Sequence, residues 1–459
     1  MKQYDVIIVG AGPAGIFAAL ELYKNNPDID VLMLEKGNDI DKRSCPVAEY
    51  QQSCAKCGSC SITSGFGGAG AFSDGKLTLT TQFGGRLADY IGERRLADLI
   101  DYIDQIYLEF GATEKVFGND IDKEVELLKR QAAAAELMLI PARIRHLGTE
   151  QCYKILQRLR KWLDSKIEIK TNCPVTEIIV EDGVYKAVET KDGQIYHSKY
   201  IIAAPGRDGA DWFSHQAMKL DIPNEVNPVD IGVRVEVPAE VMNHITDIVY
   251  ESKFIFYSRQ FDDRVRTFCM NPNGAVVVEN NEGLMIVNGH SYQDIKTQNT
   301  NFALLVSKSF TEPFKEPLKY GKYIANLANM LGGGVIVQRL GDLQDGRRST
   351  EARIARGLVK PTLKDATPGD LSLVLPHRYL VSLVEMLEAL DKVAPGVNSR
   401  HTLLYGVEVK FYSNRVQLDD ELRTNIKNMW AVGDGAGITR GLAQASVAGV
   451  VAARSIINN

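Results

Sequence analysis

The glycines at positions 10, 12 and 15 form a pattern that suits binding of a dinucleotide. They stand in GAGPAG, after the apolar run DVIIV (residues 5–9) and before IFAALELYKN, whose apolar residues recur at helical spacing. Gly10 permits a tight turn, Gly12 lets the backbone approach a pyrophosphate, and Gly15 lets the helix pack closely on the strand. The N-terminus of that helix would offer N–H groups and partial positive charge to a diphosphate.

An acid completes this pattern. The next apolar run, VLMLE, ends in Glu35, a position from which a carboxylate can accept hydrogen bonds from ribose hydroxyls. Strand, turn, helix, second strand and acid together predict a dinucleotide-binding fold. This fingerprint is shared by sites for FAD and for NAD.

The C-terminal stretch IKNMWAVGDGAGITRGLAQASVAGVVAARSI (residues 426–456) reads as a strand ending at Gly433 and Asp434, a glycine-rich turn and a helix of small residues. It resembles the second flavin motif of glutathione-reductase-type flavoproteins. This resemblance implies that Asp434 binds the ribityl chain of FAD and that the following helix N-terminus faces the flavin pyrimidine. YIIAAPGR (residues 200–207) resembles the segment by which such proteins return from a β-meander to the nucleotide domain. The three matches in order favour FAD over NAD.

Further segments extend the resemblance over nearly the whole chain. They are GFGGAGAFSDGKL after a cluster of cysteines, RHLGTE (145–150) and FCMNPNG (268–274). With the closing glycine-rich motif they resemble a family of bacterial FAD-dependent dehydrogenases whose substrate is unsettled. The resemblance implies an α/β fold, with a Rossmann-type FAD-binding domain (parallel sheet plus β-meander) that is discontinuous in sequence and an inserted mixed-sheet α+β substrate domain.

The glycine-rich loop falls where related flavoproteins place a loop that passes the diphosphate and reaches the flavin ring. Glycines there allow the backbone to approach a planar ring, although a purely structural glycine loop is the alternative. The cofactor-binding candidates are Gly10, Gly12, Pro13, Ala14, Gly15, Glu35, Lys36, Gly67, Gly68, Ala69, Gly70, Val175, Gly206, Gly433, Asp434, Gly441, Leu442 and Ala443.

Four of the seven cysteines lie close together, at Cys45, Cys54, Cys57 and Cys60. Four thiolates are the number that an iron–sulfur cluster or a structural zinc ion requires. A redox-active dithiol that exchanges electrons with the flavin is a second interpretation, and structural thiols are a third. The spacing matches no metal template closely, so all three stay open.

The pattern of elements predicts how the domains are divided. An amphipathic helix at 149–165 precedes strand-like stretches with the turns EDG and KDG, and the composition changes to a second set of strands and helices from about residue 215. We expect residues 1–85, 147–214 and 406–459 to form the FAD-binding domain. Residues 86–146 are expected as a mainly helical insertion, and residues 215–405 as the substrate domain.

A second glycine-rich motif after a strand is missing from the sequence. The architecture of pyridine-nucleotide disulfide reductases is therefore not supported, while NAD(P)H as reductant stays open.

Basic residues outside the FAD segments are candidate anchors for an anionic substrate, because guanidinium groups bind carboxylate and phosphate bidentately. They are Arg143, Arg145, His146, Arg347, Arg348 and His377. Ordinary surface ion pairs are the alternative. No acid or base stands at a spacing that would identify a catalytic proton donor.

Composition limits the partners. The 459 residues include 53 Lys and Arg against 58 Asp and Glu, a net charge of −5 that disfavours nucleic acid as the main partner. No apolar run approaches the roughly 18 to 20 residues that span a bilayer, and the N-terminal apolar run is too short for a signal peptide, so we expect a cytoplasmic protein.

These observations lead to one expected function and two alternatives. The first is an FAD-dependent oxidoreductase that transfers a hydride between flavin N5 and a small organic substrate bound between the FAD and substrate domains. The second is an electron-transfer protein in which a four-cysteine iron–sulfur cluster serves a redox partner protein. The third is a flavin-dependent RNA-modifying enzyme, against which the net charge argues.

Overall fold

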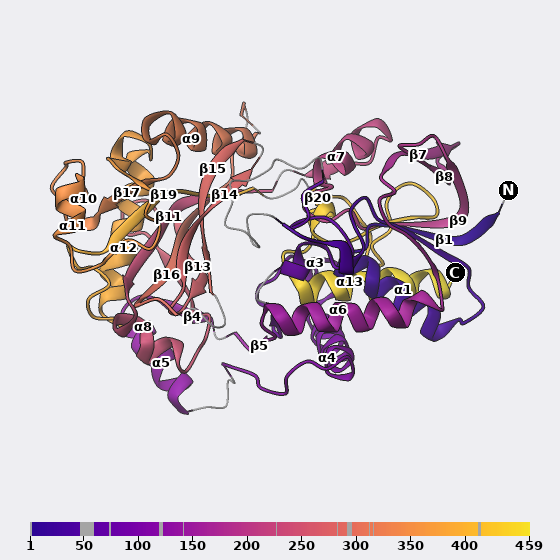
Figure 1. The fold of residues 1–459 in the computed structure, drawn as a ribbon, viewed down its shortest axis with the longest axis horizontal. Coiled ribbons are helices and arrows are strands. Elements are labelled where there is room, and N and C mark those ends of the chain that lie inside the picture. Colours follow the sequence, from indigo (N-terminus) through magenta and orange to yellow (C-terminus); the bar gives the residue numbers. More distant parts are fainter. Residues whose placement is uncertain are drawn as a thin grey trace. The chain divides into compact units, whose positions relative to one another are not determined.

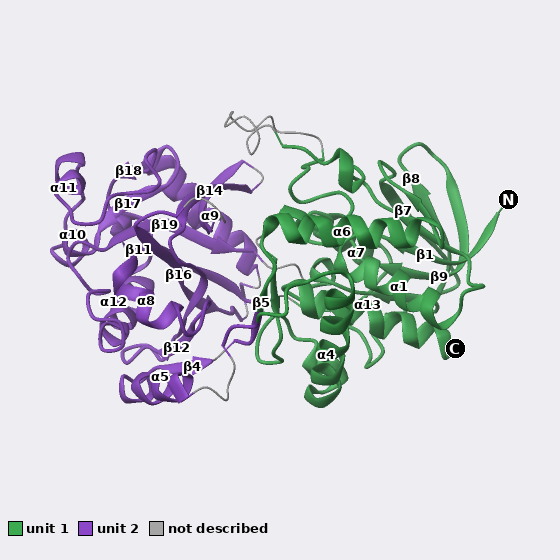
Figure 2. Ribbon diagram, turned by 60° about the horizontal axis from the view of Figure 1, so that its bottom comes forward, with its two compact units in different colours: residues 1–115, 145–226, 413–459 green, residues 116–144, 227–412 purple. Residues whose placement is uncertain are grey.

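The chain forms two compact units, which Figure 2 distinguishes by colour. The computed structural model describes residues 2–45, 59–72, 75–118, 123–140, 142–225, 227–281, 283–291, 296–311, 313–314, 316–411 and 415–459. Unit 1 comprises residues 1–115, 145–226 and 413–459, and unit 2 comprises residues 116–144 and 227–412. The chain therefore leaves unit 1 twice and returns to it twice.

A seven-stranded sheet organises unit 1. Five strands are parallel, in the order β6-β2-β1-β9-β21, and β8 and β7 continue from β9 as an antiparallel meander. Strand β2 and most of β1 are buried, as expected for near-continuous aliphatic runs in a parallel sheet. The strands are β1 (Gln3–Val9), β2 (Val31–Leu34), β6 (Glu168–Lys170), β7 (Val175–Glu181), β8 (Val184–Thr190), β9 (Ile195–Ala203) and β21 (Met429–Ala431).

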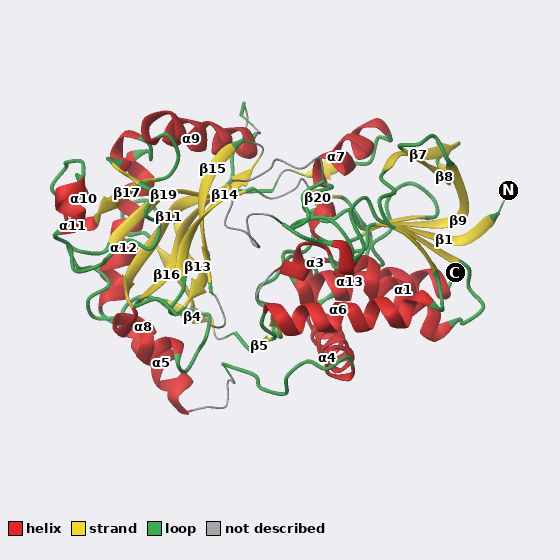
Figure 3. Cartoon of the chain, in the orientation of Figure 1, coloured by secondary structure: helices red, strands yellow, loops and turns green. Residues whose placement is uncertain are grey.

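Four long helices of unit 1, α1, α4, α6 and α13, gather on one face of this sheet (Figures 1 and 3). The helices of unit 1 are α1 (Pro13–Asn25), α3 (Ala88–Ile91), α4 (Glu93–Glu109), α6 (Thr149–Asp164), α7 (Ala210–Lys219) and α13 (Leu442–Ile457), with 3-10 helices at Ile40–Lys42, Gly68–Phe72 and Asp434–Ala436. Short strands are β3 (Lys76–Thr78), β5 (Ile144–His146), β10 (Asn224–Glu225) and β20 (Arg415–Val416).

Helix α1 lies directly against helix α13, so the first and last helices of the chain share one interface. Gly449 of α13 makes this approach possible. A Cβ atom at Gly449 would overlap the carbonyl oxygen of Ala14 and would lie 2.9 Å from the backbone nitrogen of Ala18. The two helix backbones are therefore in contact without an intervening side chain.

Unit 2 is built on an eight-stranded mixed sheet in the order β18-β17-β19-β11-β16-β13-β12-β4, beside a separate hairpin of β14 and β15. The strands are β4 (Met138–Ile140), β11 (Val229–Pro238), β12 (Lys253–Tyr257), β13 (Arg264–Asn271), β14 (Ala275–Asn281), β15 (Leu284–His290), β16 (Asn299–Lys308), β17 (Ile336–Arg339), β18 (Thr367–Pro368) and β19 (Leu403–Lys410). The helices are α5 (Lys123–Ala134), α8 (Ala239–Thr246), α9 (Pro317–Gly332), α10 (Leu340–Gln344), α11 (Glu351–Ala355) and α12 (His377–Asp391), with a 3-10 helix at Leu371–Leu373.

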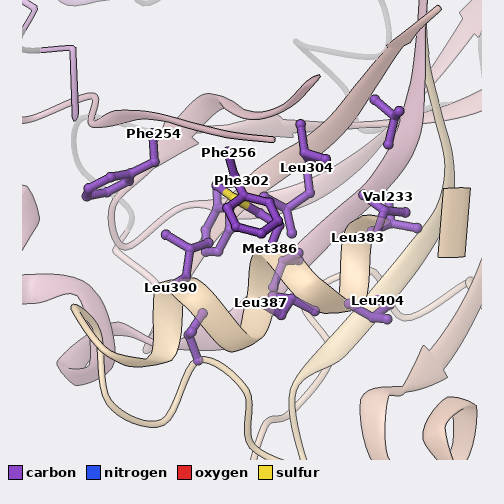
Figure 4. Close-up of a cluster of buried hydrophobic side chains, with 14 of the residues drawn as sticks. Val233, Phe254, Phe256, Phe302, Leu304, Leu383, Met386, Leu387, Leu390 and Leu404 are labelled. Carbon is purple, nitrogen blue, oxygen red and sulfur yellow. The ribbon is translucent and has the colours of Figure 1, made fainter. Parts of the chain in front are cut away.

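One face of the unit 2 sheet carries an apolar core. Figure 4 shows Phe302 and Leu304 of β16 packed with Met386 and Leu387 of α12. Because side chains alternate along a strand, the odd-numbered residues of β11 point into this core. The even-numbered ones place Asp230, Arg234 and Glu236, all buried, on the opposite face. That second face is polar, which is unusual for a buried surface.

Residues 86–146, expected as one helical insertion, are shared between the two units. Helix α4 packs on α13 in unit 1, whereas α5 and β4 belong to unit 2. The reason is the short apolar run at β4, which pairs antiparallel with β12 and extends the edge of the unit 2 sheet. Among the described helices, none is both long and apolar enough to cross a membrane.

The contact at Gly449 generates a stability prediction. We expect Gly449→Ala to lower the free energy of unfolding by about 1–3 kcal/mol, because the overlap with α1 outweighs the better helix propensity of alanine. Gly334→Ala is the matched control, since a Cβ there has no neighbour within 4 Å, and it should change stability by less than about 0.5 kcal/mol. Urea unfolding of both variants measures the difference, and equal stabilities would refute the close-packing argument.

Candidate functional site

A cavity of about 470 Å³ lies in unit 1 at the carboxyl edge of the parallel sheet. Its walls include Gly10 after β1, Glu35 after β2, Ala204 after β9 and Gly433 after β21. The first residues of α1 and α13 line it as well. This edge is where open α/β sheets bind their ligands, because loops and helix N-termini converge there.

Most of the cofactor-binding candidates from the sequence line this cavity. They are Gly10, Gly12, Pro13, Ala14, Glu35, Lys36, Gly68, Ala69, Gly70, Val175, Gly206, Gly433, Asp434, Gly441 and Leu442. Gly15, Gly67 and Ala443 are not among the lining residues. At Gly15 the absent side chain serves packing instead, because a Cβ would overlap the carbonyl oxygen of Gly10.

Three of the lining glycines leave space that a ligand can use. A Cβ built at Gly12, Gly206 or Gly441 meets no protein atom within 4 Å, so these three lining positions have open space beside them. Gly10 differs, because its φ of +105° and its contact with the carbonyl group of Ala204 require glycine for the turn itself.

Glu35 is a buried carboxylate held by backbone amides. Its Oε2 accepts a hydrogen bond from the N–H of Ala11 at 2.8 Å, and its Oε1 accepts from Gly37 at 2.8 Å and Gly65 at 2.9 Å. Since a carboxylate has about four acceptor positions, one remains for a ligand hydroxyl. Glu35 thus also ties the glycine-rich loop to the end of β2.

Lys36 was a candidate from the sequence, but its partners Asp208 and Ser64 were missed. Asp208 pairs with Lys36 and accepts a hydrogen bond from Ser64, and all three residues line the cavity. Burial acts to raise the pKa of the Asp208 carboxyl, but these two partners outweigh it and leave the pKa lowered. Arg207 and Asp208 lie four and five positions after the end of β9, and this location after a parallel strand was the signal available in the sequence.

Asp434 lies at the start of the 3-10 helix after β21, with about a fifth of its side chain exposed. Its Oδ1 accepts a hydrogen bond from Thr439 at 2.8 Å, and the guanidinium of Arg207 is 3.8 Å away. Burial raises the pKa of the Asp434 carboxyl despite these partners. The protein therefore holds a carboxyl group at the cavity at a cost in free energy.

Arg43 holds the glycine-rich loop through hydrogen bonds to its backbone carbonyl groups. Its guanidinium is buried and donates hydrogen bonds to the carbonyl oxygens of Ser61, Ile62, Phe66 and Gly68, at 2.7–3.0 Å. Burial lowers its pKa to about 10, so it stays protonated at neutral pH. No pattern in the sequence signalled this role, because it depends on loop geometry.

Family comparison identifies the class of protein that carries this cavity. The family described as FAD dependent oxidoreductase matches residues 5–266, more than half of the chain. The chain belongs to this family. A second family, FAD-dependent protein, C-terminal domain-like, matches residues 228–411.

Individual relatives add little detail. An uncharacterized protein of Clostridium beijerinckii is 28% identical over 478 residues, which cover 98% of this chain and 80% of that protein. A thioredoxin reductase of Listeria monocytogenes is 61% identical over 36 residues, 8% of this chain and 11% of that protein. Among solved structures, pyridoxine 4-oxidase from Mesorbium loti has a TM-score of 0.48 at 14% identity, covering 100% of both chains. A 3-ketosteroid dehydrogenase from Rhodococcus jostii RHA1 has a TM-score of 0.45 at 12% identity, covering 99% of this chain and 96% of that one.

Membership of the family confirms the resemblance read from the sequence. The protein is an FAD-dependent oxidoreductase, and its fold joins a Rossmann-type domain with an inserted mixed-sheet domain, as expected. The residues present in unit 1 fit the cofactor: open glycines, two helix N-termini and a buried acid after β2 line one cavity.

The four-cysteine hypothesis cannot be followed through the described residues. Cys54 and Cys57 lie outside them, while Cys45 and Cys60 are free thiols at the two ends of that stretch. Within the described ranges no group of three or more Cys, His, Asp or Glu side chains forms a metal site. A cluster, zinc or dithiol at these positions stays a prediction.

The basic candidates from the sequence fall in several places. Arg145 is a buried ion-pair partner, with Nε and Nη2 donating to Asp104 of α4 at 2.7 and 2.6 Å, so its guanidinium is already engaged. His146 is half-buried in unit 1, and Arg143 is half-buried in unit 2. Arg347, Arg348 and His377 are exposed in unit 2, where the ring of His377 meets the ring edge of Phe261.

The polar face of the unit 2 sheet holds a cluster that the sequence did not reveal. Three cations surround the half-buried ring of Phe268, with Arg266 at 4.9 Å, Lys253 at 5.4 Å and Lys410 at 5.7 Å from its centroid. Buried carboxylates hold two of them from below, Asp230 on Arg266 and Glu408 on Lys410. Alternation along β13 puts residues 266 and 268 on one face, but only the structure shows that β12 and β19 bring lysines to the same ring.

The Arg43 geometry predicts the behaviour of the loop. Arg43→Met should lower the free energy of unfolding of unit 1 by about 2–4 kcal/mol, because several carbonyl groups lose a charged donor in a buried place. Amide hydrogen exchange at Gly65–Gly70 should speed up in this variant. Arg158→Met is the control, since that side chain donates to a single exposed carbonyl, of Phe110. Unchanged exchange in Arg43→Met would contradict the assignment.

Proposed function

We propose that the unit 1 cavity binds FAD and that the protein transfers a hydride between flavin N5 and a small organic substrate. The observation that carries the proposal is the set of open glycines at the cavity, Gly12, Gly206 and Gly441, together with two helix N-termini that meet there. The family of FAD-dependent enzymes supports it.

Each wall of the cavity then has a role. The N-terminal amides of α1 would receive the diphosphate, since the first N–H groups of a helix have no partner within the helix. Glu35 would accept a hydrogen bond from a ribose hydroxyl through its remaining acceptor position. Asp434 would accept from the ribityl chain, and the loop held by Arg43 would lie along the ring. When bound, FAD supplies the hydride acceptor and donor that amino-acid side chains lack.

We further propose that the polar face around Phe268 binds the substrate and that the substrate is an organic anion. Three cations, two of them fixed by buried acids, offer charge, and the ring offers an apolar contact. Cys269, next to the ring, adopts φ +45° at an irregularity of β13, a backbone strain typical of functional sites.

FAD binding can be tested at Gly12. Gly12→Val should weaken FAD affinity at least about 100-fold, because the new side chain begins at a cavity-lining position where a Cβ has no protein atom within 4 Å. The far-UV circular dichroism should stay unchanged. Gly334→Ala, in open space, should retain FAD. Flavin absorbance after reconstitution and gel filtration gives the measurement, and full retention of FAD by Gly12→Val would exclude this cavity.

The pKa of Asp434 gives a prediction about pH. Because its folded-state pKa is raised above the unfolded value, the folded form of the FAD-free protein loses stability as pH rises through that pKa. Asp434→Asn removes this cost, so the FAD-free variant should be more stable than the parent at pH 7, with the difference shrinking toward pH 4. FAD affinity should fall in the same variant. Thermal unfolding at several pH values measures the difference in stability. An Asp434→Asn variant less stable than the parent at pH 7 would contradict this prediction.

The substrate proposal can be tested by substituting two lysines of the unit 2 sheet, one at the Phe268 cluster and one outside it. Lys410→Met should slow the turnover of anionic substrates found by screening and raise their KM at least about tenfold, as expected for the loss of a charged contact. Lys308→Met is the control, because Lys308 also lies in this sheet with a carboxylate partner, Asp263, and similar exposure. Equal effects of both substitutions would rule out a specific role in substrate binding for the cations around Phe268.

A further inference from the structure

We propose that unit 2 carries a second binding site, formed by Arg339, Arg348 and Arg353, for a phosphate-bearing ligand. The site lies around the end of β17 and the start of α11, on residues separate from those of the unit 1 cavity. It does not depend on the FAD proposal.

The segment around these three arginines has a net positive charge, whereas the whole chain is negatively charged. Residues 339–356 together with Arg400 contain six arginines and three acids, Asp342, Asp345 and Glu351, a net charge of +3 in a chain whose total is −5. A local excess of one sign raises the concentration of counter-ions at a surface. The region therefore favours an anion.

Two of the acids are already engaged by other groups. Asp342 is buried and accepts from Arg347 Nε at 3.0 Å and from Ser349 Oγ at 2.8 Å. Asp345 pairs with Arg347 at 2.9 Å and with Arg400. These contacts fix the turn between α10 and α11 and pair Arg347 and Arg400 with acids, so the proposed site does not include Arg347.

The remaining arginines form no close ion pair. Within the part of the chain that the structure describes, no carboxylate lies within ion-pair distance of Arg339, Arg348 or Arg353. Asp342 attracts Arg339 and Arg353, and Asp345 attracts Arg339, over longer distances. They touch one another through the backbone instead: Arg339 Nη1 donates to the carbonyl oxygen of Arg353 at 3.3 Å, and Arg353 Nη1 donates to that of Arg348 at 2.8 Å. The guanidinium of Arg339 thus contacts the backbone of Arg353, and that of Arg353 contacts the backbone of Arg348.

The guanidinium of Arg339 does not use all of its hydrogen-bond donors. Its Nε is buried and has no hydrogen-bond partner among the described residues, and its Nη2 lies 3.5 Å from Nδ1 of His401. A buried N–H without a partner costs free energy, and native proteins seldom leave one. An anion seated against the outer nitrogens of Arg339 would accept a hydrogen bond and reduce the repulsion between the neighbouring cations.

Phosphate fits the site better than a single carboxylate. Guanidinium groups donate pairs of parallel hydrogen bonds, and a phosphate group presents three or four oxygens and up to two charges to several of them at once. The backbone under Arg339 is fixed, because its N–H donates to the buried Ser349 Oγ at 2.9 Å. The shared chemistry is phosphate, which either an inorganic polyphosphate or a nucleotide can supply.

Titration calorimetry on the FAD-loaded full chain tests the site, because bound FAD keeps phosphate out of the unit 1 cavity. If FAD is not retained, the Gly12→Val chain serves instead, since it leaves the arginines intact. Inorganic pyrophosphate should bind in a manner that weakens as salt rises. Arg339→Met and Arg348→Ala should each weaken it at least tenfold. Arg348 is exposed, so its removal does not threaten folding.

Arg356→Met is the matched control, because Arg356 is exposed in the same segment and its Nε donates to a carbonyl of its own helix, that of Ala352. ADP has the same number of phosphates as pyrophosphate, so binding of ADP more than tenfold tighter would identify a nucleotide as the ligand, and a smaller difference would identify free polyphosphate. The proposal is overturned if pyrophosphate and ADP both fail to bind, or if Arg356→Met weakens binding as much as Arg348→Ala does.

Discussion

Contact between the backbones of α1 and α13 is the constraint on which unit 1 depends. Because no side chain separates the helices at Gly449, their N-termini are held beside one another at the edge of the parallel sheet. Each terminus carries about half a positive charge, and two such ends repel each other unless an anionic group lies between them. The packing of these two helices therefore places two partial positive charges close together. Negative charge on a diphosphate and on a reduced flavin ring would reduce the repulsion between them.

The charged side chains around the cavity differ in how well hydrogen bonds compensate for their burial. Glu35 and Arg43 are buried ions, yet both are surrounded by backbone partners, so they stiffen the glycine-rich loop that has few side chains of its own. Asp434 is less well compensated. Proteins commonly keep such a poorly stabilised group only where function requires it.

The sequence predicted local features of unit 1 well because they depend on neighbours in the chain. Gly10 and Gly12 follow a strand and precede a helix, and Glu35 ends the next strand, so their meeting at one edge follows from parallel pairing. Arg43 and the Phe268 cluster could not be predicted, since their partners come from loops or strands distant in sequence. The split of residues 86–146 was missed for the same reason: three residues of β4 pair with β12, more than a hundred positions later.

The order of segments has a consequence for how the protein is made. Unit 2 ends at residue 412, whereas the cavity of unit 1 needs Gly433, Gly441 and Ala445. During translation, unit 2 can complete its sheet while unit 1 still lacks β21 and α13, and domains tend to fold as their residues emerge. The nascent chain therefore leaves the α13-facing surface of α1 uncovered until α13 has been synthesised. The cavity is complete only after Gly433, Gly441 and Ala445 have emerged from the ribosome.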